Sequence, residues 1–313
     1  MIAIVDGNNL AYRSFYTPMG SLTTSLGKAS GCIMGLLNQL KALQETTDVE
    51  RIIVMWDSGK AEWRKELHPE YKANRSYGKT EEEKVKFDEL YSQMNTLHEM
   101  LPMIGIHSIK MDVPFEADDL IYGATKYLSE IDEEVLVVTS DKDMYQLIGD
   151  KVSLYTPTKK KVIGISDFYD EVGVRHSAYM GYRALLGDTS DNISGVPGIG
   201  EKTAKNLMDK YGHIDNVLNP NPADKKVLMK SKRTARIFEE ENLQIIGRNH
   251  RIMNFKYVDE HLEKIDFLGL LTRQLDGELT FNGVEFRKFL TEWQFVSILS
   301  DFNAWSGKFR LLY

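Results

Sequence analysis

The sequence predicts an α/β fold in which a mainly parallel central sheet is flanked by helices and followed by a smaller helical unit. Three short apolar runs, Ile2–Val5, Arg51–Trp56 and Val135–Thr139, have the pattern of buried strands. Helical patterns separate these runs, which favours right-handed crossovers and parallel pairing. Further along, a Gly- and Pro-containing turn at 195–200 joins two helical patterns and marks the smaller unit.

Length and composition set the broad organisation. The chain has 313 residues, of which 42% are hydrophobic, so we expect a large domain over 1–175, a helical subdomain over 176–265 and a C-terminal extension over 266–313 with no assigned role. No apolar run reaches membrane length and no signal peptide is evident, so we expect a cytoplasmic protein. The single cysteine, Cys32, fits a reducing compartment, and we predict that it is a core residue on a helix over Ala29–Leu43.

Each predicted strand is followed by an aspartate. The first run stops at Asp6, the second at Asp57, and the third leads into Asp141 and Asp143. A single aspartate in such a place is an ordinary turn former. In open α/β sheets, however, ligands bind beyond the carboxyl ends of the strands. Three strands that each deliver an aspartate to this edge therefore indicate a site.

More carboxylates crowd the first turn of a helix that follows the second strand. Glu116, Asp118 and Asp119 lie within four positions, and the positive end of the helix offsets their repulsion only in part. Asp188 and Asp191 follow later. We hypothesise one metal basin made of Asp6, Asp57, Glu116, Asp118, Asp119, Asp141, Asp143, Asp188 and Asp191. Oxygen ligands select Mg²⁺ or Mn²⁺, whereas one cysteine and unpaired histidines argue against zinc.

The turn Gly195–Gly200 suits an anion. Gly198 and Gly200 allow backbone N–H groups to approach a phosphate, and the helix from Glu201 adds a positive end with Lys202 and Lys205. The stretch resembles a helix–hairpin–helix motif that contacts the nucleic-acid backbone; the alternative is an ordinary helical corner. The basic run 225–236 would extend this track, or form a solvated helix face. The formal net charge of −7 does not oppose this, because 39 basic residues face only 37 acids outside the basin.

Two further stretches carry expectations. Aromatic and basic side chains interleave over Lys60–Lys79, as in grooves that hold single strands, although a solvated basic helix would show a similar pattern. We predict two helices over about 62–103 that are joined by a mobile polar segment and span the mouth of the basin. In the C-terminal extension, 284–299 has an aromatic stripe at helical spacing, and we favour a core role over a partner-binding tail.

These motifs together resemble the 5′-nuclease family, which comprises flap endonucleases and the 5′–3′ exonucleases of bacteria and bacteriophages. The resemblance covers about 1–246 and is carried by the following motifs: Asp6-Gly7-Asn8, Tyr71-Lys-Ala-Asn-Arg75, Glu116-Ala-Asp-Asp119, Ser140-Asp-Lys-Asp143 and Gly187-Asp-Thr-Ser-Asp-Asn192 before the turn. The chain departs from the family at Ser194, where relatives often carry proline. The resemblance implies a PIN/resolvase-like nuclease domain with a helical arch and a C-terminal helix–hairpin–helix (H3TH) subdomain. The chain looks most like a stand-alone phage or bacterial member of the family.

The resemblance also implies residue roles. Asp6, Asp57, Glu116, Asp118 and Asp119 would serve one Mg²⁺ or Mn²⁺ ion, and Asp141, Asp143, Asp188 and Asp191 would serve or support a second. Lys72 and Arg75 would be catalytic, reaching the scissile phosphate from the arch. Nucleic-acid contacts would come from Arg13, Tyr71, Gly198, Gly200, Lys202, Thr203 and Lys205, with Tyr71 stacking near the reacting nucleotide. Family members often bind K⁺ in the hairpin loop.

We therefore expect a structure-specific 5′ nuclease that acts on DNA with a 5′ single-stranded end or flap joined to duplex. An RNA–DNA hybrid is a further candidate substrate, replication proteins are candidate partners, and we expect a monomer in a bacterial cell or a phage-infected host. One alternative is a PIN-like ribonuclease, which would leave the hairpin and arch unused. The other is a non-catalytic protein that binds DNA junctions, which would have little reason to tolerate so many clustered acids.

Overall fold

The computed structural model describes residues 1–59, 61–75, 80–277, 279–307 and 309–311. Its centre is a six-stranded sheet with the order β3-β2-β1-β4-β5-β6. The strands are β1 (Ile2–Asp6), β2 (Arg51–Met55), β3 (His107–Ile109), β4 (Val135–Val138), β5 (Val152–Thr156) and β6 (Lys161–Ile163). Strands β1 to β5 pair in parallel, and β6 runs antiparallel to β5. The predicted mainly parallel sheet is confirmed.

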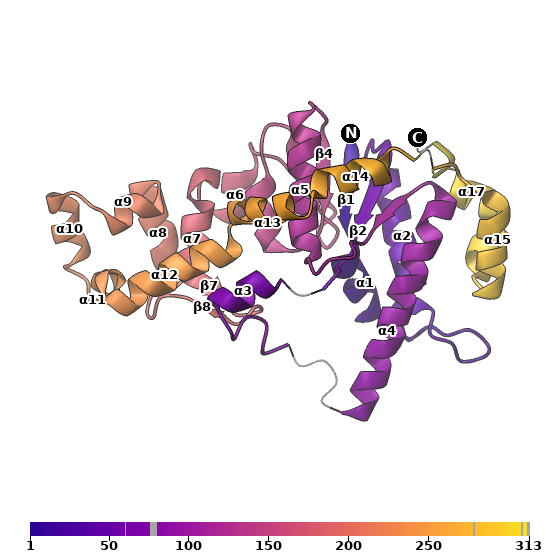
Figure 1. Cartoon of the computed structure of the whole chain (residues 1–313), viewed down its shortest axis with the longest axis horizontal. Coiled ribbons are helices and arrows are strands. Elements are labelled where there is room, and N and C mark those ends of the chain that lie inside the picture. The colour runs from indigo at the N-terminus through magenta and orange to yellow at the C-terminus, as the bar shows by residue number, and fades with distance from the viewer. Residues whose placement is uncertain (60, 76–79, 278, 308, 312–313) are drawn as a thin grey trace.

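Helices cover both faces of this sheet (Figure 1). Along β1, Ile2 and Ile4 join the core beneath α5 (Ala117–Glu130), whereas Ala3 and Val5 join the core beneath α1 (Gly7–Phe15) and α2 (Gly31–Thr46). This alternation is the two-residue period of a strand that is buried on both sides. Cys32 is fully buried on α2, as predicted, although the helix begins and ends later than the expected 29–43.

The arch consists of α3 (Glu62–Leu67) and α4 (Glu81–Met100). Figure 1 shows α4 as a long helix that projects away from the sheet. It begins at a capping box, in which the side chains of Thr80 and Glu83 each bond the backbone N–H of the other residue. The two predicted helices are confirmed. The stretch predicted to hold single-stranded nucleic acid includes three residues that lie outside the described ones: Lys60, Tyr77 and Lys79.

The helical subdomain extends from the other side of the sheet domain (Figure 1). Helix α7 (Tyr179–Leu186) leads into a short hairpin of β7 (Gly187–Asp188) and β8 (Ile193–Ser194), and then into α8 (Glu201–Tyr211). Helix α6 (Phe168–Val172) precedes the subdomain, whose further helices are α9 (Ile214–Leu218), α10 (Pro222–Leu228), α11 (Lys232–Ala235), α12 (Glu240–Met253) and α13 (Asp259–Lys264). The predicted domain boundaries near 175 and 265 remain predictions.

The C-terminal extension packs back against the sheet domain. Helix α14 (Phe267–Leu275) contributes Phe267 and Leu271 to the core shared with α5. Helices α15 (Gly283–Glu292), α16 (Val296–Ser300) and α17 (Phe302–Ser306) place an aromatic cluster in the core shared with α2 and α4, and Phe286 at its centre is fully buried. The expected core role of this stripe is confirmed. Within the described ranges, no helix combines the length and the apolar composition needed to cross a bilayer.

Candidate active site

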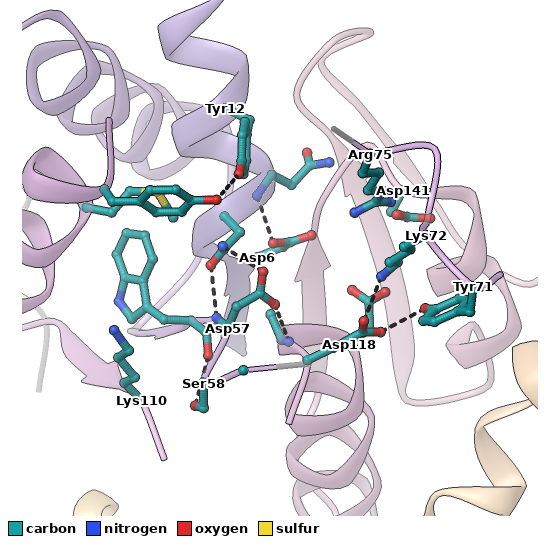
Figure 2. A pocket seen from close by; sticks show the side chains of 18 of the residues that line it. Asp6, Tyr12, Asp57, Ser58, Tyr71, Lys72, Arg75, Lys110, Asp118 and Asp141 are labelled. Atoms are coloured by element: carbon teal, nitrogen blue, oxygen red, sulfur yellow. Dashed lines mark hydrogen bonds and ion pairs between the residues drawn. The ribbon is translucent and has the colours of Figure 1, made fainter. Parts of the chain in front are cut away.

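The aspartates at the end of β1 and just after β2 and β4 meet at the carboxyl edge of the sheet. The strand order reverses between β1 and β4, and such a switch point is where open α/β sheets bind ligands. Asp6, Asp57 and Asp141 line a cavity of about 920 Å³ together with Glu116 and Asp118 from the start of α5. Figure 2 shows Asp6, Asp57 and Asp118 in the middle of this cavity.

The sequence Asp6-Gly7-Asn8-Asn9 holds the three strand ends together. Asn8 donates its side-chain N–H to Asp57 at 2.7 Å and accepts the backbone N–H of Asp57 at 2.9 Å. Asn9 accepts the backbone N–H of Ser140, which follows β4, at 3.1 Å. At Gly7, any Cβ atom would come within 2.8 Å of the Trp56 ring and the Val54 side chain. The motif therefore fixes the geometry of the edge as well as supplying a carboxylate.

Asp6, Asp118 and Asp141 repel one another. Burial, together with the carboxylates of Asp57 and Asp141, raises the pKa of Asp6 to about 7, even though Asp6 accepts the Asn9 N–H at 2.9 Å and the Thr139 hydroxyl at 3.0 Å. Burial and the carboxylates of Asp141 and Asp6 raise the pKa of Asp118 well above its ordinary value. Such clustering destabilises the ionised forms unless a cation lies among them.

The acids at the start of α5 point in different directions. Asp119 is fully buried and accepts two hydrogen bonds from Arg64, at 2.6 and 2.9 Å. Arg64 is itself 3% exposed, bonds Glu116 at 3.2 Å, and donates its Nε–H to the Ile252 carbonyl of α12 at 3.1 Å. Asp119 does not line the cavity. Both oxygens of Asp119 are engaged by a buried arginine, and the predicted metal contact of Asp119 stays a prediction.

Glu116 collects the two residues of the predicted arch motif. Lys72 Nζ lies 2.9 Å from Glu116 Oε1, and the Tyr71 hydroxyl donates to Oε2 at 2.9 Å (Figure 2). Burial opposes ionisation of Glu116, but Lys72 and Arg64 outweigh it and lower its pKa. Tyr71 is 6% exposed and packs against Ile193. It lines the cavity, and its predicted stacking near the reacting nucleotide stays a prediction.

The remaining aspartates pair with arginines. Arg183 bridges Asp143 and Asp188 at 2.5 and 2.6 Å. Burial outweighs the attraction of Arg183 and raises the pKa of Asp143 to about 7. Arg75 contacts Asp191 at 2.5 Å, and Lys72 lies 3.7 Å from the same carboxylate.

The predicted basin thus divides in two. Glu116, Asp119, Asp143, Asp188 and Asp191 have arginine or lysine partners within the protein. In the described part of the chain, no ion pair reaches Asp6, Asp57, Asp118 or Asp141, and all four line the cavity. Among the described residues, no three histidines, cysteines or acids are close enough together to hold a metal ion as they stand. The unpaired set consists of oxygen donors only, which fits a hard divalent cation.

Comparison with known proteins identifies the family. The family described as "5′-3′ exonuclease, N-terminal resolvase-like domain" matches residues 1–184, which is more than half of the chain. The chain belongs to the 5′–3′ exonuclease family. Its companion, "5′-3′ exonuclease, C-terminal SAM fold", matches 174–266. These matches confirm the expected family, the resolvase-like domain and the helical subdomain. They also support the expectation that the protein is a nuclease.

Two curated relatives show how the family is organised. The 5′–3′ exonuclease of Buchnera aphidicola (Schizaphis graminum strain) is 35% identical over 219 residues, covering 70% of this chain and 73% of that protein. The thermostable DNA polymerase I of Thermus thermophilus is 32% identical over 283 residues, covering 86% of this chain. This chain spans only 32% of the polymerase.

Solved structures of the bacteriophage T5 protein share the fold. The T5 D15 protein crystallised with metal ions has 25% sequence identity and a TM-score of 0.69, over 88% of this chain and 97% of that one. The T5 5′-exonuclease with bound zinc has 25% identity and a TM-score of 0.70 over 88% of this chain and 98% of that one. Divalent ions are thus present in relatives of this exonuclease.

The hairpin of this exonuclease has the backbone that its glycines predict. Gly198 has φ +84°, in the left-handed region, and Gly200 caps the N-terminus of α8. Lys202 is exposed and Thr203 half-buried, whereas Lys205 pairs with Glu201 at 2.9 Å. Arg236 lies beside Gly198. The basic residues 225, 226, 230, 232, 233 and 236 are all exposed, as either a phosphate-binding track or a solvated helix face requires, so the predicted track stays a prediction.

Arg13 lies elsewhere. It lines a separate cavity of about 250 Å³ with Lys160, on the side of α1 turned away from the carboxylates. Asn9 and Tyr12 of the same helix face the acidic cavity instead. The structure therefore does not bring Arg13 together with Lys72 and Arg75, and its predicted phosphate contact stays a prediction.

The contacts that hold the arch in place could not be predicted from the sequence. The segment 68–75 is hydrogen-bonded to the β7–β8 turn, as the backbone N–H of Lys72 donates to the Asp191 carbonyl at 2.9 Å and Asn192 donates to the Glu70 carbonyl at 2.7 Å. Arg64 and Arg183 were also missed. A signal existed for Arg183, since it lies on the apolar helical face of α7 five positions before Asp188.

Proposed function

We propose that this exonuclease is a structure-specific 5′ nuclease that hydrolyses phosphodiester bonds in DNA with a 5′ single-stranded end or flap next to duplex. The observation that carries the proposal is the set of four unpaired carboxylates, Asp6, Asp57, Asp118 and Asp141, in one cavity with Lys72 and Arg75. Metal ions would bind the four carboxylates that have no basic partner. A bound phosphodiester would draw Lys72 and Arg75 away from the carboxylates with which they now pair. The arch beside the cavity favours a single strand as the substrate.

We propose Mg²⁺ or Mn²⁺ as the cofactor, with two ions. Asp6, Asp57, Asp118 and Asp141 would hold them, and Glu116, Asp143, Asp188 and Asp191 would support the set through their paired cations. Two such ions supply activation of water and stabilisation of the departing oxygen. Asp119 is assigned a structural role because Arg64 engages both of its oxygens.

The basic side chains of the chain would act on the phosphate. Lys72 is held 2.9 Å from Glu116 and Arg75 2.5 Å from Asp191, so both are already poised at the rim of the cavity. A scissile phosphate would compete for these cations, which would then offset the charge that builds on its oxygens. Tyr71 would hold Glu116 in place through its hydroxyl group, because its ring is covered.

The helical subdomain would hold the duplex. Gly198 and Gly200 present the N-terminus of α8, with Lys202, Thr203 and Lys205 in its first turns, to a phosphate. The exposed basic track over 225–236 would follow the same backbone. K⁺ in the hairpin loop, action on RNA–DNA hybrids, a monomeric state and replication partners belong to the same proposal and need separate tests.

A cleavage assay on a labelled 5′-flap duplex, with Mg²⁺ or with EDTA, tests the function. We expect Mg²⁺-dependent release of the flap with a 5′-phosphate and a 3′-hydroxyl at the cut. Cleavage of RNA without cleavage of DNA would favour a ribonuclease instead. Tight flap binding without cleavage under any divalent ion would favour a protein that only binds junctions.

A further inference from the structure

The acidic cavity continues past the carboxylates to a second polar group. Asn95 and His98 on α4, and Lys110 just after β3, line its far part. Figure 2 shows Lys110 on the opposite side of Asp6, Asp57 and Asp118 from Lys72 and Arg75. The cavity therefore has basic side chains at both ends and acids between them. The function proposed above uses none of these three residues.

Hydrogen bonds hold this group in place. The buried Trp56 donates its indole N–H to the Ser108 hydroxyl at 2.8 Å, and the same hydroxyl lies 2.8 Å from His98 Nδ1. Lys110 Nζ donates to the Asn95 side-chain oxygen at 3.4 Å. The imidazole is thus fixed through one nitrogen. Its other nitrogen has no hydrogen-bond partner among the described residues.

The charges of the group suit a single anion. Lys110 is exposed, and within the described ranges it forms no ion pair. Burial and the neighbouring Lys110 lower the pKa of His98, so the ring is neutral near pH 7 and contributes a hydrogen bond instead of a charge. The group therefore offers one positive charge, from Lys110, beside a neutral amide and a neutral imidazole. Such a set can donate hydrogen bonds to a phosphate oxygen and is unsuited to binding a cation.

The position of the group relative to the subdomain gives the direction of the strand. The subdomain is tied to the Lys72 end of the cavity, through the 68–75 segment on the β7–β8 turn and through Arg64 on the Ile252 carbonyl. Duplex held by the subdomain therefore approaches from that end. A strand that passes the carboxylates away from the duplex next reaches α4 and Lys110.

We propose that Asn95, His98 and Lys110 form a subsite for a phosphate of the single strand on the 5′ side of the scissile bond. This rests on the proposed function. The phosphate is either an internal phosphodiester of a flap or the terminal 5′-phosphate of a one-nucleotide overhang. In both cases Lys110 supplies the charge, and the subsite draws the 5′ strand past the carboxylates.

Binding of 5′-flap DNA in EDTA, by the full chain, tests the subsite. We expect Lys110→Met to weaken binding about three- to ten-fold and to reduce the salt dependence by about one counterion, as for loss of one phosphate contact. Lys151→Met is the matched control, because Lys151 precedes β5 at the amino edge of the sheet and pairs with Asp132. It should bind like the unmodified protein, and both variants should unfold at the same temperature.

Substrates locate the phosphate. A neutral methylphosphonate at the first phosphate 5′ of the scissile bond, or removal of the terminal 5′-phosphate from a one-nucleotide overhang, should weaken binding by the unmodified protein. At the phosphate that contacts Lys110, the same change should cause no further loss of binding by the Lys110→Met variant. Equal losses for both proteins at every position would overturn the subsite. Failure of the unmodified protein to cleave the flap with Mg²⁺ would instead refute the proposed function.

Discussion

The buried ion pair between Arg64 and Asp119 gives the sharpest test of the architecture around the site. Asp119 is fully buried and bonds Arg64 through both oxygens, and Arg64 also bonds Glu116 and the Ile252 carbonyl. Removing one partner of such a pair leaves an uncompensated buried charge and costs about 3–5 kcal/mol. We expect Arg64→Met to reach the upper end of that range. Asp119→Leu should cost less, because Arg64 keeps Glu116.

Urea unfolding followed by circular dichroism, in EDTA, measures these costs for both single variants and for the double variant. The double variant should lose less unfolding free energy than the two single variants lose together, by roughly 1–3 kcal/mol. The effects of residues in contact are not additive, and an apolar pair can replace a buried ionic pair. A loss below about 1 kcal/mol for Arg64→Met, or additive losses in the double variant, would refute this view of the pair.

Three other predictions concern single residues. Lys72→Ala should lower turnover by roughly 10²–10³-fold with little loss of flap binding, because its charge acts on the phosphate in the transition state; single-turnover cleavage and binding in EDTA separate the two, and a loss of binding alone would deny the catalytic role. Asp118→Asn should leave the metal-free protein at least as stable as the unmodified one, because Asp6 and Asp141 repel Asp118, while the rise in melting temperature with Mg²⁺ should shrink; an unchanged Mg²⁺ effect would argue against a metal at Asp118. Burial raises the pKa of the Cys32 thiol to about 12, so the folded protein should not react with Ellman's reagent at pH 8 until urea unfolds it, and rapid native labelling would contradict the predicted burial.

The sheet and its acidic edge could be predicted because they follow from local rules. A buried parallel strand is a short apolar run, and the residue after it lies at the ligand-binding edge whatever the rest of the fold does. Asp6, Asp57 and Asp141 were found in this way. The glycine requirement at Gly198 also followed from sequence, since a left-handed turn is a property of a few adjacent residues.

The cations that share the site could not be predicted in the same way. Arg64 lies in a short helix between Trp63 and Lys65, and nothing in that pattern distinguishes a 3% exposed guanidinium from a solvated one. Its burial depends on α5 and α12, which are remote in sequence. For the same reason Asp119 was grouped with the metal ligands, since three acids in one helical turn show crowding but not which of them turns inward.

Lys72 shows how backbone geometry, beyond charge, sets the position of a cation in this site. Neighbouring side chains on a helix or strand point apart, yet Tyr71 and Lys72 both reach Glu116, one to each oxygen. Lys72 has φ +56°, in the left-handed region that costs a residue with a Cβ about 1 kcal/mol or more. The backbone hydrogen bond from Lys72 to Asp191 helps to offset that cost. The β7–β8 turn, which also carries the predicted acid Asp191, therefore holds the strained backbone that directs Lys72 at the cavity. A lysine placed one position later could not replace it.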